Sequence, residues 1–282
     1  MISIIIVNYN VKKHLKLCLK KITESVLVPE YEVILIDNAS DIGIEDFKSD
    51  KISVFSLNEN LGFSKAVNFG ISNSIGDTIL LLNPDTLIKK DTISLLSAYL
   101  NSDLNVGVVG CKVLNTDGTY QLSSKRMFPN IKVLFSLFFK LNFILPSSKF
   151  FGAYNYTFKN HDELLEVDSI SGSCMMFRRD VYKKVDKFDE NYFLYFEDTD
   201  FCLRLKDAGY KVVYNPATSI IHHKGESFKS CNARVKNEFY NSMSYFFKKY
   251  KNKYPYWRFV LFFIPLLVFF STCLNLTKNK RD

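Results

Sequence analysis

Two hydrophobic periodicities alternate along the first third of the chain. Residues 2–9, "ISIIIVNY", form a β-branched run that is typical of a buried parallel strand. Residues 11–25 then place apolar side chains at the spacing of an amphipathic helix. Similar patterns predict further strands at 32–37, 52–57 and 78–82 and helices at 64–74 and 91–100. This order predicts an α/β fold with a mostly parallel central sheet and right-handed crossovers.

The second half of the chain has a less regular pattern. A strand is predicted at 106–114, and residues 167–185 predict a strand followed by a helix that Asp180 caps. Residues 198–209 predict a helix with an acidic first turn and a C-terminal glycine.

Composition limits the class of protein. The 282 residues are 47% hydrophobic, which excludes an intrinsically disordered chain. Because no repeat or low-complexity linker is present, we expect one continuous domain at 1–228 and a further segment at 229–282. The N-terminus lacks the features of a secretory signal, and the six scattered cysteines form no CxxC pair. We therefore expect reduced core thiols and a main domain in the cytosol.

The C-terminal segment is first basic and then apolar. Its basic part suits nucleic acid or an anionic membrane surface. It has one acid, Glu238, against eight bases: Lys229, Arg234, Lys236, Lys248, Lys249, Lys251, Lys253 and Arg258. Residues 259–276 are 18 positions without charge, near the lower limit for a membrane-spanning helix. We expect a helical tail that spans, re-enters or lies on the cytoplasmic face of the cell membrane, assisted by the Phe-rich stretch 131–146. A buried core helix is the alternative.

Informative polar residues follow each of the first four predicted strands. They are Asn8 and Asn10, Asp37, Asn60 and Gly62, and Asn83 and Asp85, in chain order. Loops after strands are often polar, and Asn-Pro-Asp at 83–85 is also good turn chemistry. Four such loops at one sheet edge nevertheless favour a ligand site, because ligands bind at the carboxyl ends of parallel strands.

The chain lacks the glycine-rich loops that cradle phosphate. Neither GxGxxG nor GxxxxGK[ST] occurs, so a nucleotide diphosphate would need another counter-charge. A divalent cation held by a carboxylate supplies one, since magnesium and manganese prefer oxygen ligands. Asp85 is the predicted ligand.

Seven motifs together resemble the family 2 glycosyltransferases, most closely a rhamnosyltransferase-like branch. The resemblance covers residues 2–228, and its motifs are "SIIIVNYN", "VILIDNAS", "NLGFSKAVNFGI", "ILLLNPDT", "SGSCMMFRRD", "YFEDTDFCLRLKDAGY" and "IIHHKGES". It implies the GT-A fold, a Rossmann-like nucleotide-diphospho-sugar transferase fold. It also implies a nucleotide-sugar donor, a divalent metal and inversion at the anomeric carbon.

The resemblance also implies roles for the polar residues of the first three loops. Asp37 corresponds to the acid that contacts the nucleobase or ribose, with Asn8 and Asn10 beside it. Asn60 and Gly62 are expected to line the donor pocket.

Two further motifs concern the metal and the diphosphate. Asn83 and Asp85 match the family's DxD motif, with Asn in place of the first Asp. Asp85 is then the metal ligand and Asn83 a donor contact. The H-x-x-G-x-S pattern implies that His222 is the second protein ligand of manganese or magnesium, or a contact to the diphosphate.

The acidic cluster "FEDTD" has two interpretations. Acids in the first turn of a helix complement its macrodipole and cap it. An inverting transfer, in contrast, needs a carboxylate that takes the proton from the acceptor hydroxyl. The resemblance assigns that role to Asp198, and Glu197 is expected to hold the acceptor or orient the base.

Together these features predict an inverting glycosyltransferase that uses a nucleotide-diphosphate sugar. We expect a hydroxyl acceptor, a lipid-linked saccharide of cell-surface polysaccharide synthesis, and the inner membrane surface as a partner. Rhamnose is expected as the sugar from the resemblance to the rhamnosyltransferase-like branch alone. No nucleic-acid partner is expected. One alternative is a nucleotidyltransferase on a similar sheet, although the early Gly-rich loop and lysine that it needs are absent. The other is a non-catalytic protein that binds nucleic acid or membrane through the basic segment.

Overall fold

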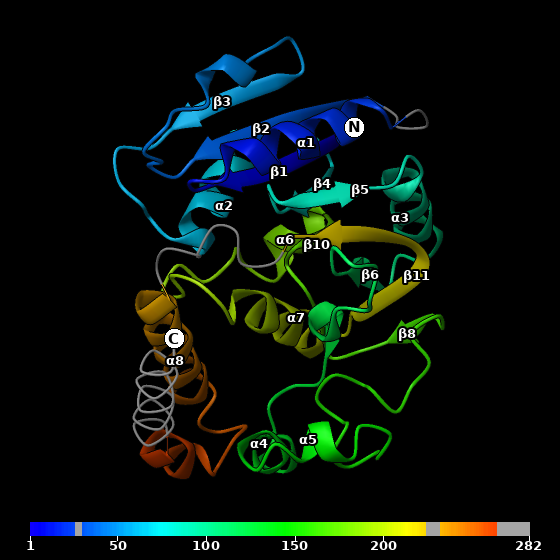
Figure 1. The fold of residues 1–282 in the computed structure, drawn as a ribbon, viewed down its shortest axis with the longest axis vertical. Coiled ribbons are helices and arrows are strands. Elements are labelled where there is room, and N and C mark those ends of the chain that lie inside the picture. Colours follow the sequence, from blue (N-terminus) through cyan, green and yellow to red (C-terminus); the bar gives the residue numbers. More distant parts are fainter. Residues whose placement is uncertain (26–29, 224–231, 264–282) are drawn as a thin grey trace.

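One nine-stranded sheet forms the centre of the protein (Figure 1). The computed structural model describes residues 1–25, 30–223 and 232–263. The strand order is β3-β2-β1-β4-β10-β6-β11-β5, with β8 paired to β11. The strands are β1 Ile2–Asn8, β2 Tyr31–Asp37, β3 Ile52–Ser56, β4 Thr78–Leu82, β5 Thr86–Ile88, β6 Val106–Leu114, β8 Leu165–Glu166, β10 Cys174–Arg178 and β11 Lys211–His222. A second sheet pairs β7 Lys125–Arg126 with β9 Ser169–Ile170.

Helices cover both faces of the central sheet. Side chains alternate along β1, so that Ile4 and Ile6 pack in one cluster with α1 and α3, and Ile5 and Val7 pack in another with α2, α6 and α7. The helices are α1 Lys12–Thr23, α2 Phe63–Ser72, α3 Thr92–Ser102, α4 Ile131–Phe138, α5 Leu141–Ile144, α6 Arg179–Lys184, α7 Glu197–Asp207 and α8 Asn232–Lys249.

The predicted α/β architecture is confirmed, with differences at the level of single elements. β3, β2, β1 and β4 are mutually parallel, and β11 is parallel to β6. β10 runs antiparallel to both β4 and β6, a direction that the pattern of apolar residues did not predict. The prediction that Asp180 caps α6 is wrong: Arg178 is the N-cap residue and Asp180 lies in the first turn. Four cysteines are buried free thiols, as predicted: Cys18, Cys111, Cys174 and Cys202.

The buried carboxylate of Asp200 joins α8 to α7. Asp200 is fully buried, and its Oδ1 accepts hydrogen bonds from Lys249 Nζ at 2.6 Å and Tyr250 Oη at 2.8 Å. Its Oδ2 accepts from Arg204 Nε at 2.8 Å. Lys249 belongs to the basic stretch predicted as a nucleic-acid or membrane surface, and it is instead paired inside the fold. The domain boundary at residue 228 stays a prediction. Helix α8, which follows this boundary, packs on α7, which precedes it.

The apolar tail is described only at its beginning. Residues 257–263 are helical, and the remainder of the predicted 259–276 stretch lies outside the described residues. Among the described residues, no helix is both long and apolar enough to cross a membrane. In Figure 1, α4 and α5, which contain most of the Phe-rich stretch 131–146, lie at the end of the molecule opposite β3.

We expect Asp200→Asn to lower the free energy of unfolding by about 3–5 kcal/mol, because it removes a buried counter-ion from two cations. Urea unfolding followed by circular dichroism measures this change.

Asp207→Asn is the matched control on the same helix. Asp207 pairs with Lys253 at the surface, where its side chain is 51% exposed. Asp207→Asn should lower the free energy of unfolding by less than about 1 kcal/mol. Equal losses in the two variants would show that the buried pair contributes no more than a surface one.

Candidate active site

The ends of β1 and β2 form the first part of the site. Asn8 and Asp37 are the last residues of these strands and lie opposite each other in the parallel register. Asn8 Nδ2 donates to Asp37 Oδ1 at 3.1 Å and to Ser40 Oγ at 3.0 Å, and the Ser40 hydroxyl also donates to Asp37. The Asn10 backbone N–H donates to Ser40 Oγ at 2.9 Å. The structure therefore brings the predicted residues Asn8, Asn10 and Asp37 together around one serine.

The loop after β3 is fixed to the loops on both sides of it. Asn38 Nδ2 donates to Asn60 Oδ1 at 3.0 Å, and the same oxygen accepts from the Gly62 backbone N–H at 3.0 Å. Gly62 has a φ of +82°, and a Cβ at this position would lie 2.7 Å from the carbonyl oxygen of Phe193. Only glycine fits this conformation and this close approach. Asn60 and Gly62 thus lie between the β2 loop and the segment that leads into α7.

Asn83, Asp85 and His222 meet beyond the end of β4. The short strand β5 pairs antiparallel with β11 and places Thr86 opposite His222. His222 Nε2 lies 3.3 Å from Asp85 Oδ1 and 3.4 Å from Asn83 Nδ2. Asp85 is buried, and its Oδ1 has no hydrogen-bond partner among the described residues. A buried carboxylate oxygen without a donor, facing an imidazole nitrogen, is an arrangement that fits a cation.

These residues provide two protein ligands for a divalent cation. Within the described ranges no group of three or more His, Cys, Asp or Glu side chains is placed to hold a metal. A carboxylate and an imidazole suit magnesium or manganese only if other oxygen ligands complete the coordination. A substrate diphosphate and water could provide them.

The acidic cluster opens α7. Tyr195 and Phe196 have φ values of +69° and +67°, a conformation that is uncommon for residues other than glycine. Glu197 and Asp198 follow in the first turn and are both buried. Asp198 Oδ2 accepts a hydrogen bond from Arg126 Nη2 at 2.6 Å, within an ion pair between two largely buried side chains.

A backbone segment before β10 connects the acidic cluster with the end of β4. The Gly172 backbone N–H donates to Asp198 Oδ2 at 3.1 Å. The carbonyl of the next residue, Ser173, accepts from the Asn83 backbone N–H at 3.0 Å. Consecutive residues of one segment therefore contact the base candidate and the DxD-like motif, which places both at the same edge of the sheet.

Glu197 and Asp198 are two neighbouring buried carboxyl groups, and Arg126 pairs with only one of them. Burial, followed by the negative charge of Asp198, raises the pKa of Glu197 to about 8. The Glu197 Oε2 atom is buried and has no hydrogen-bond partner among the described residues. Arg126 therefore has its ion-pair partner in Asp198, whereas the raised pKa favours a protonated Glu197 at neutral pH.

Sequence reasoning missed Arg126 and Gly172 as parts of the site, and it placed Ser40 among the polar residues after the second strand without giving it a role. Arg126 lies 72 residues before its partner Asp198, in a two-residue strand without any periodic signal. Ser40 and Gly172 belong to the motifs "VILIDNAS" and "SGSCMMFRRD", so the resemblance marked their segments without assigning them roles.

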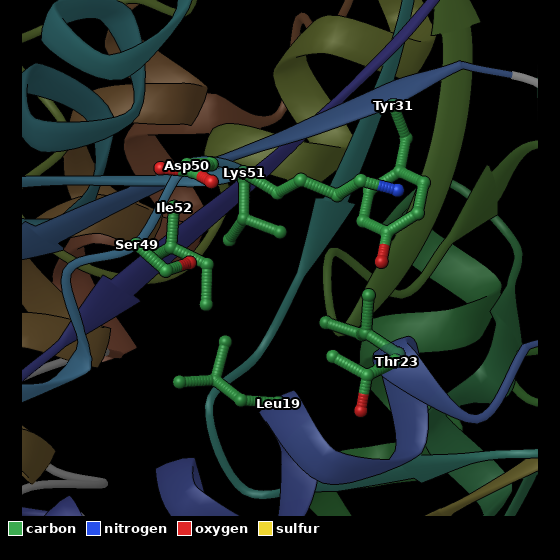
Figure 2. Close-up of a pocket in the computed structure, with 9 residues that line it drawn as sticks. Leu19, Thr23, Tyr31, Ser49, Asp50, Lys51 and Ile52 are labelled. Carbon is green, nitrogen blue, oxygen red and sulfur yellow. The ribbon is translucent and has the colours of Figure 1, made fainter.

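A separate hollow of about 300 Å³ lies at the other edge of the sheet (Figure 2). It is bounded by α1 and by the amino ends of β2 and β3, where Lys51 Nζ lies 4.7 Å from the centre of the Tyr31 ring. None of the predicted site residues lines it. Ligand sites of parallel sheets lie at the opposite, carboxyl edge, so this hollow is not the candidate site.

A mostly parallel sheet, covered on both faces and with carboxylates and amides at its carboxyl edge, defines an α/β enzyme with a substrate site there. Residues 3–186 match the model of Glycosyl transferase family 2, and the chain belongs to this family. It is thus a glycosyltransferase, which decides against the nucleotidyltransferase and non-catalytic alternatives.

Curated relatives include two rhamnosyltransferases. The N-acetylglucosaminyl-diphospho-decaprenol L-rhamnosyltransferase of Mycobacterium tuberculosis is 27% identical over 240 residues, which cover 80% of this chain and 77% of that protein. Rhamnosyltransferase WbbL of Escherichia coli is 28% identical over 242 residues, which cover 82% of this chain and 87% of that protein.

Solved structures show the same fold at low sequence identity. The mannosyltransferase PcManGT from Pyrobaculum calidifontis, in complex with GDP-Man and Mn²⁺, has a TM-score of 0.59 and 16% identity, over 88% of this chain and 63% of that one. S. aureus TarS 1–349 in complex with UDP-GlcNAc has a TM-score of 0.56 and 19% identity, over 86% and 64% of the two chains. This chain therefore spans slightly less than two thirds of either structure. These likenesses confirm the predicted GT-A fold.

We expect Glu197→Gln to raise the melting temperature, and to raise it more at pH 8 than at pH 5. The pKa of Glu197 is raised in the folded state from an ordinary 4.5 to about 8. Between these values the folded protein keeps a proton that the unfolded chain has released, so stability falls as pH rises through this window. Glutamine carries no such penalty. Each kcal/mol corresponds to about 2–4 °C for a domain of this size, and calorimetry at several pH values measures it.

Glu24→Gln is the control, because Glu24 lies at the surface and its pKa is lowered by hydrogen bonding to Lys21. Its effect on melting temperature should stay nearly constant from pH 5 to pH 8. A Glu197→Gln effect that is equally flat would contradict a protonated Glu197 in the folded protein.

Proposed function

We propose that this glycosyltransferase inverts the anomeric carbon of a nucleotide-diphosphate sugar and uses Asp198 as general base toward a hydroxyl acceptor. The observation that carries the proposal is the environment of Asp198. Arg126 and the Gly172 backbone N–H hold its Oδ2 atom in place, while the segment containing Gly172 bonds to the Asn83 backbone. A general base must be held in place near the donor site to remove the proton from the acceptor hydroxyl, and a fixed carboxylate beside the DxD-like motif meets this requirement.

The donor is proposed to bind across the ends of β1, β2 and β3. The Asp37 carboxylate can accept a hydrogen bond from the nucleobase or ribose, and Asn8 fixes its orientation from the neighbouring strand. Asn10, Asn60 and Gly62 surround this position through the loops described above. Their rigid hydrogen bonding preorganises the pocket, which lowers the cost of ordering on binding.

The diphosphate is proposed to lie beside Asp85, His222 and Asn83. Manganese or magnesium would be held by Asp85 Oδ1 and His222 Nε2, which lie 3.3 Å apart. When bound, such a cation offsets the negative charge on the leaving diphosphate. The mannosyltransferase PcManGT was solved with Mn²⁺, which supports this proposal through the shared fold.

Glu197 is proposed to assist the acceptor rather than to take its proton. A protonated carboxyl can donate a hydrogen bond to an acceptor oxygen, whereas the ionised Asp198 can accept the proton of the attacking hydroxyl. The position of Arg126 supports this division of roles, because its ion pair is with Asp198 and not with Glu197.

The sugar is proposed to be rhamnose and the acceptor a lipid-linked saccharide. Both proposals rest on the names of the relatives, in particular the enzyme that acts on N-acetylglucosaminyl-diphospho-decaprenol. The dTDP-rhamnosyl transferase RfbF of Shigella flexneri supports a dTDP-linked donor, at 24% identity over 209 residues.

We also propose that the α4–α5 end contacts the cytoplasmic face of the cell membrane. It exposes large apolar side chains, among them Phe135, Phe143 at 71% and Ile144 at 68%. Phe262 of the following helical residues is 69% exposed. No acid occurs between residues 118 and 161, and the three lysines on and beside α4 and α5 are exposed. Apolar side chains among basic ones suit an anionic lipid surface.

We expect Asp198→Asn to remain folded at a lower melting temperature, because Arg126 loses its buried counter-ion, and to lose transfer by a factor of about 10² to 10⁴, the usual contribution of a general base. The assay is transfer from dTDP-rhamnose to a polyprenyl-diphosphate-linked N-acetylglucosamine. Asp198 lies in the first turn of α7, where its structural partner is Arg126, so a purely structural role would lower stability and leave the turnover of the folded protein almost unchanged.

Thr199→Ala is the matched control for this variant. Thr199 contacts Asp198 Oδ1 at 3.2 Å through its hydroxyl and carries no charge, so its removal should have a small effect. Near-normal turnover of a folded Asp198→Asn protein would contradict the proposed base.

We expect the combined substitution of Phe135, Phe143 and Ile144 by serine to reduce flotation of the full chain with vesicles containing anionic phospholipid. Burial of each large apolar side chain contributes about 1.5–3 kcal/mol, so the loss should be large. The matched control replaces three apolar residues elsewhere that are 66–76% exposed, Ile42, Ile75 and Leu104. Equal flotation of both triple variants would contradict a membrane contact at α4–α5.

A further inference from the structure

A continuous chain of hydrogen bonds runs from the surface to His222. Thr119 Oγ1 donates to Asp117 Oδ1 at 2.6 Å and accepts from Asn115 Nδ2 at 2.9 Å. Gln121 Nε2 donates to Asn115 Oδ1 at 3.0 Å. The other end of the same amide, Gln121 Oε1, lies 3.0 Å from His222 Nδ1. Gln121 is buried, whereas Asp117 lies at the surface.

The exposed carboxylate of Asp117 determines which group donates and which accepts in every hydrogen bond of this series. An ionised carboxylate only accepts, so the Thr119 hydroxyl gives it its single proton and is left to accept from Asn115. The Asn115 amide therefore turns its oxygen toward Gln121, and Gln121 in turn points its own oxygen at His222. Ser123 Oγ donates to the same Gln121 oxygen at 3.3 Å, which agrees with this orientation.

The direction of these hydrogen bonds determines which ring nitrogen of His222 carries the proton. An amide oxygen only accepts, so Nδ1 must be the protonated nitrogen of the neutral ring. Nε2 then presents its lone pair to Asp85 Oδ1 at 3.3 Å. Asn83 Nδ2, at 3.4 Å, can donate to Nε2, which agrees with this tautomer. The lone pairs of Nε2 and Asp85 Oδ1 nevertheless repel each other, and a cation between them would remove the repulsion.

We propose that Gln121 is a positioning residue that holds His222 as the Nδ1–H tautomer and so keeps Nε2 unprotonated, with its lone pair available to a divalent cation. Asp117 fixes the tautomer from the surface through Thr119 and Asn115. The inference rests on the proposed role of Asp85 and His222 as cation ligands. A partner on the second ring nitrogen is the usual way in which proteins orient an imidazole ligand.

Nitrogen NMR of the metal-free full chain tests the tautomer directly. The chain has four histidines, so ¹⁵N-histidine labelling gives few ring signals, and His222→Gln identifies those of His222. At a pH where the ring is neutral, we expect a protonated Nδ1 and an unprotonated Nε2. Gln121→Met should shift His222 toward the Nε2–H form, which can donate to Asp85. An Nε2–H ring in the wild-type protein would overturn the proposal.

Binding of Mn²⁺ alone, followed by the EPR signal of the free ion, tests the consequence. Gln121→Met should weaken binding by about 10- to 100-fold, the usual effect of losing such a partner. Asp117→Ala should also weaken Mn²⁺ binding, by a smaller factor. Because this change is at the surface, it keeps the inference testable if Gln121→Met does not fold. Ser123→Ala leaves the hydrogen bonds from Asp117 to His222 intact, and this variant should bind Mn²⁺ as the wild type does.

Asp85→Ala separates this inference from the proposed function. If Gln121→Met binds Mn²⁺ normally while Asp85→Ala has lost Mn²⁺ binding, the proposed role of Gln121 is wrong and the proposed metal site stands. If Asp85→Ala also binds normally, the proposed site itself fails, and the role of Gln121 fails with it.

Discussion

The antiparallel pairing of β10 with β4 is the constraint on which the candidate site depends. Because β10 runs against its neighbours, its amino end lies beside the carboxyl end of β4, with Cys174 opposite Leu82. The residues just before β10 can then bond on one side to Asn83 and on the other to Asp198. A parallel β10 would place these residues at the far edge of the sheet. One reversed strand thus joins the donor side and the acceptor side of the site.

The buried carboxyl groups at this edge of the sheet have different surroundings. Asp198 pairs with Arg126, Asp85 faces His222, and Glu197 is favoured in its neutral form. A second ionised carboxylate beside Asp198 would leave a buried charge without compensation, which costs several kcal/mol. Burial, followed by the negative charge of Asp198, raises the pKa of Glu197 and makes the two acids chemically different. That difference is what a site needs when one group accepts a proton and its neighbour donates a hydrogen bond.

Sequence patterns predicted the parts of the fold that have local signals. The β-branched runs of β1, β2 and β4 and the polar residues after them are local features, so Asn8, Asp37 and Asp85 could be placed at one edge. The direction of β10 and the pairing of Arg126 with Asp198 depend on contacts between distant parts of the chain. Such contacts leave no periodicity. Lys249 was assigned to a basic surface for the same reason, because its partner is a distant buried carboxylate on α7.

The Asp200 contact links the acidic cluster to the apolar end of the molecule. Asp200 lies two residues after Asp198 on α7 and binds Lys249 and Tyr250, at the end of α8. The chain then continues to Tyr256, whose hydroxyl lies 3.5 Å from the carbonyl of Pro129, just before α4. Buried ion pairs and packed aromatic rings deform little, so α7 and the exposed surface of α4 are held in one geometry. If that surface rests on lipid, the base candidate keeps a fixed height above the membrane, as an acceptor with a lipid anchor requires.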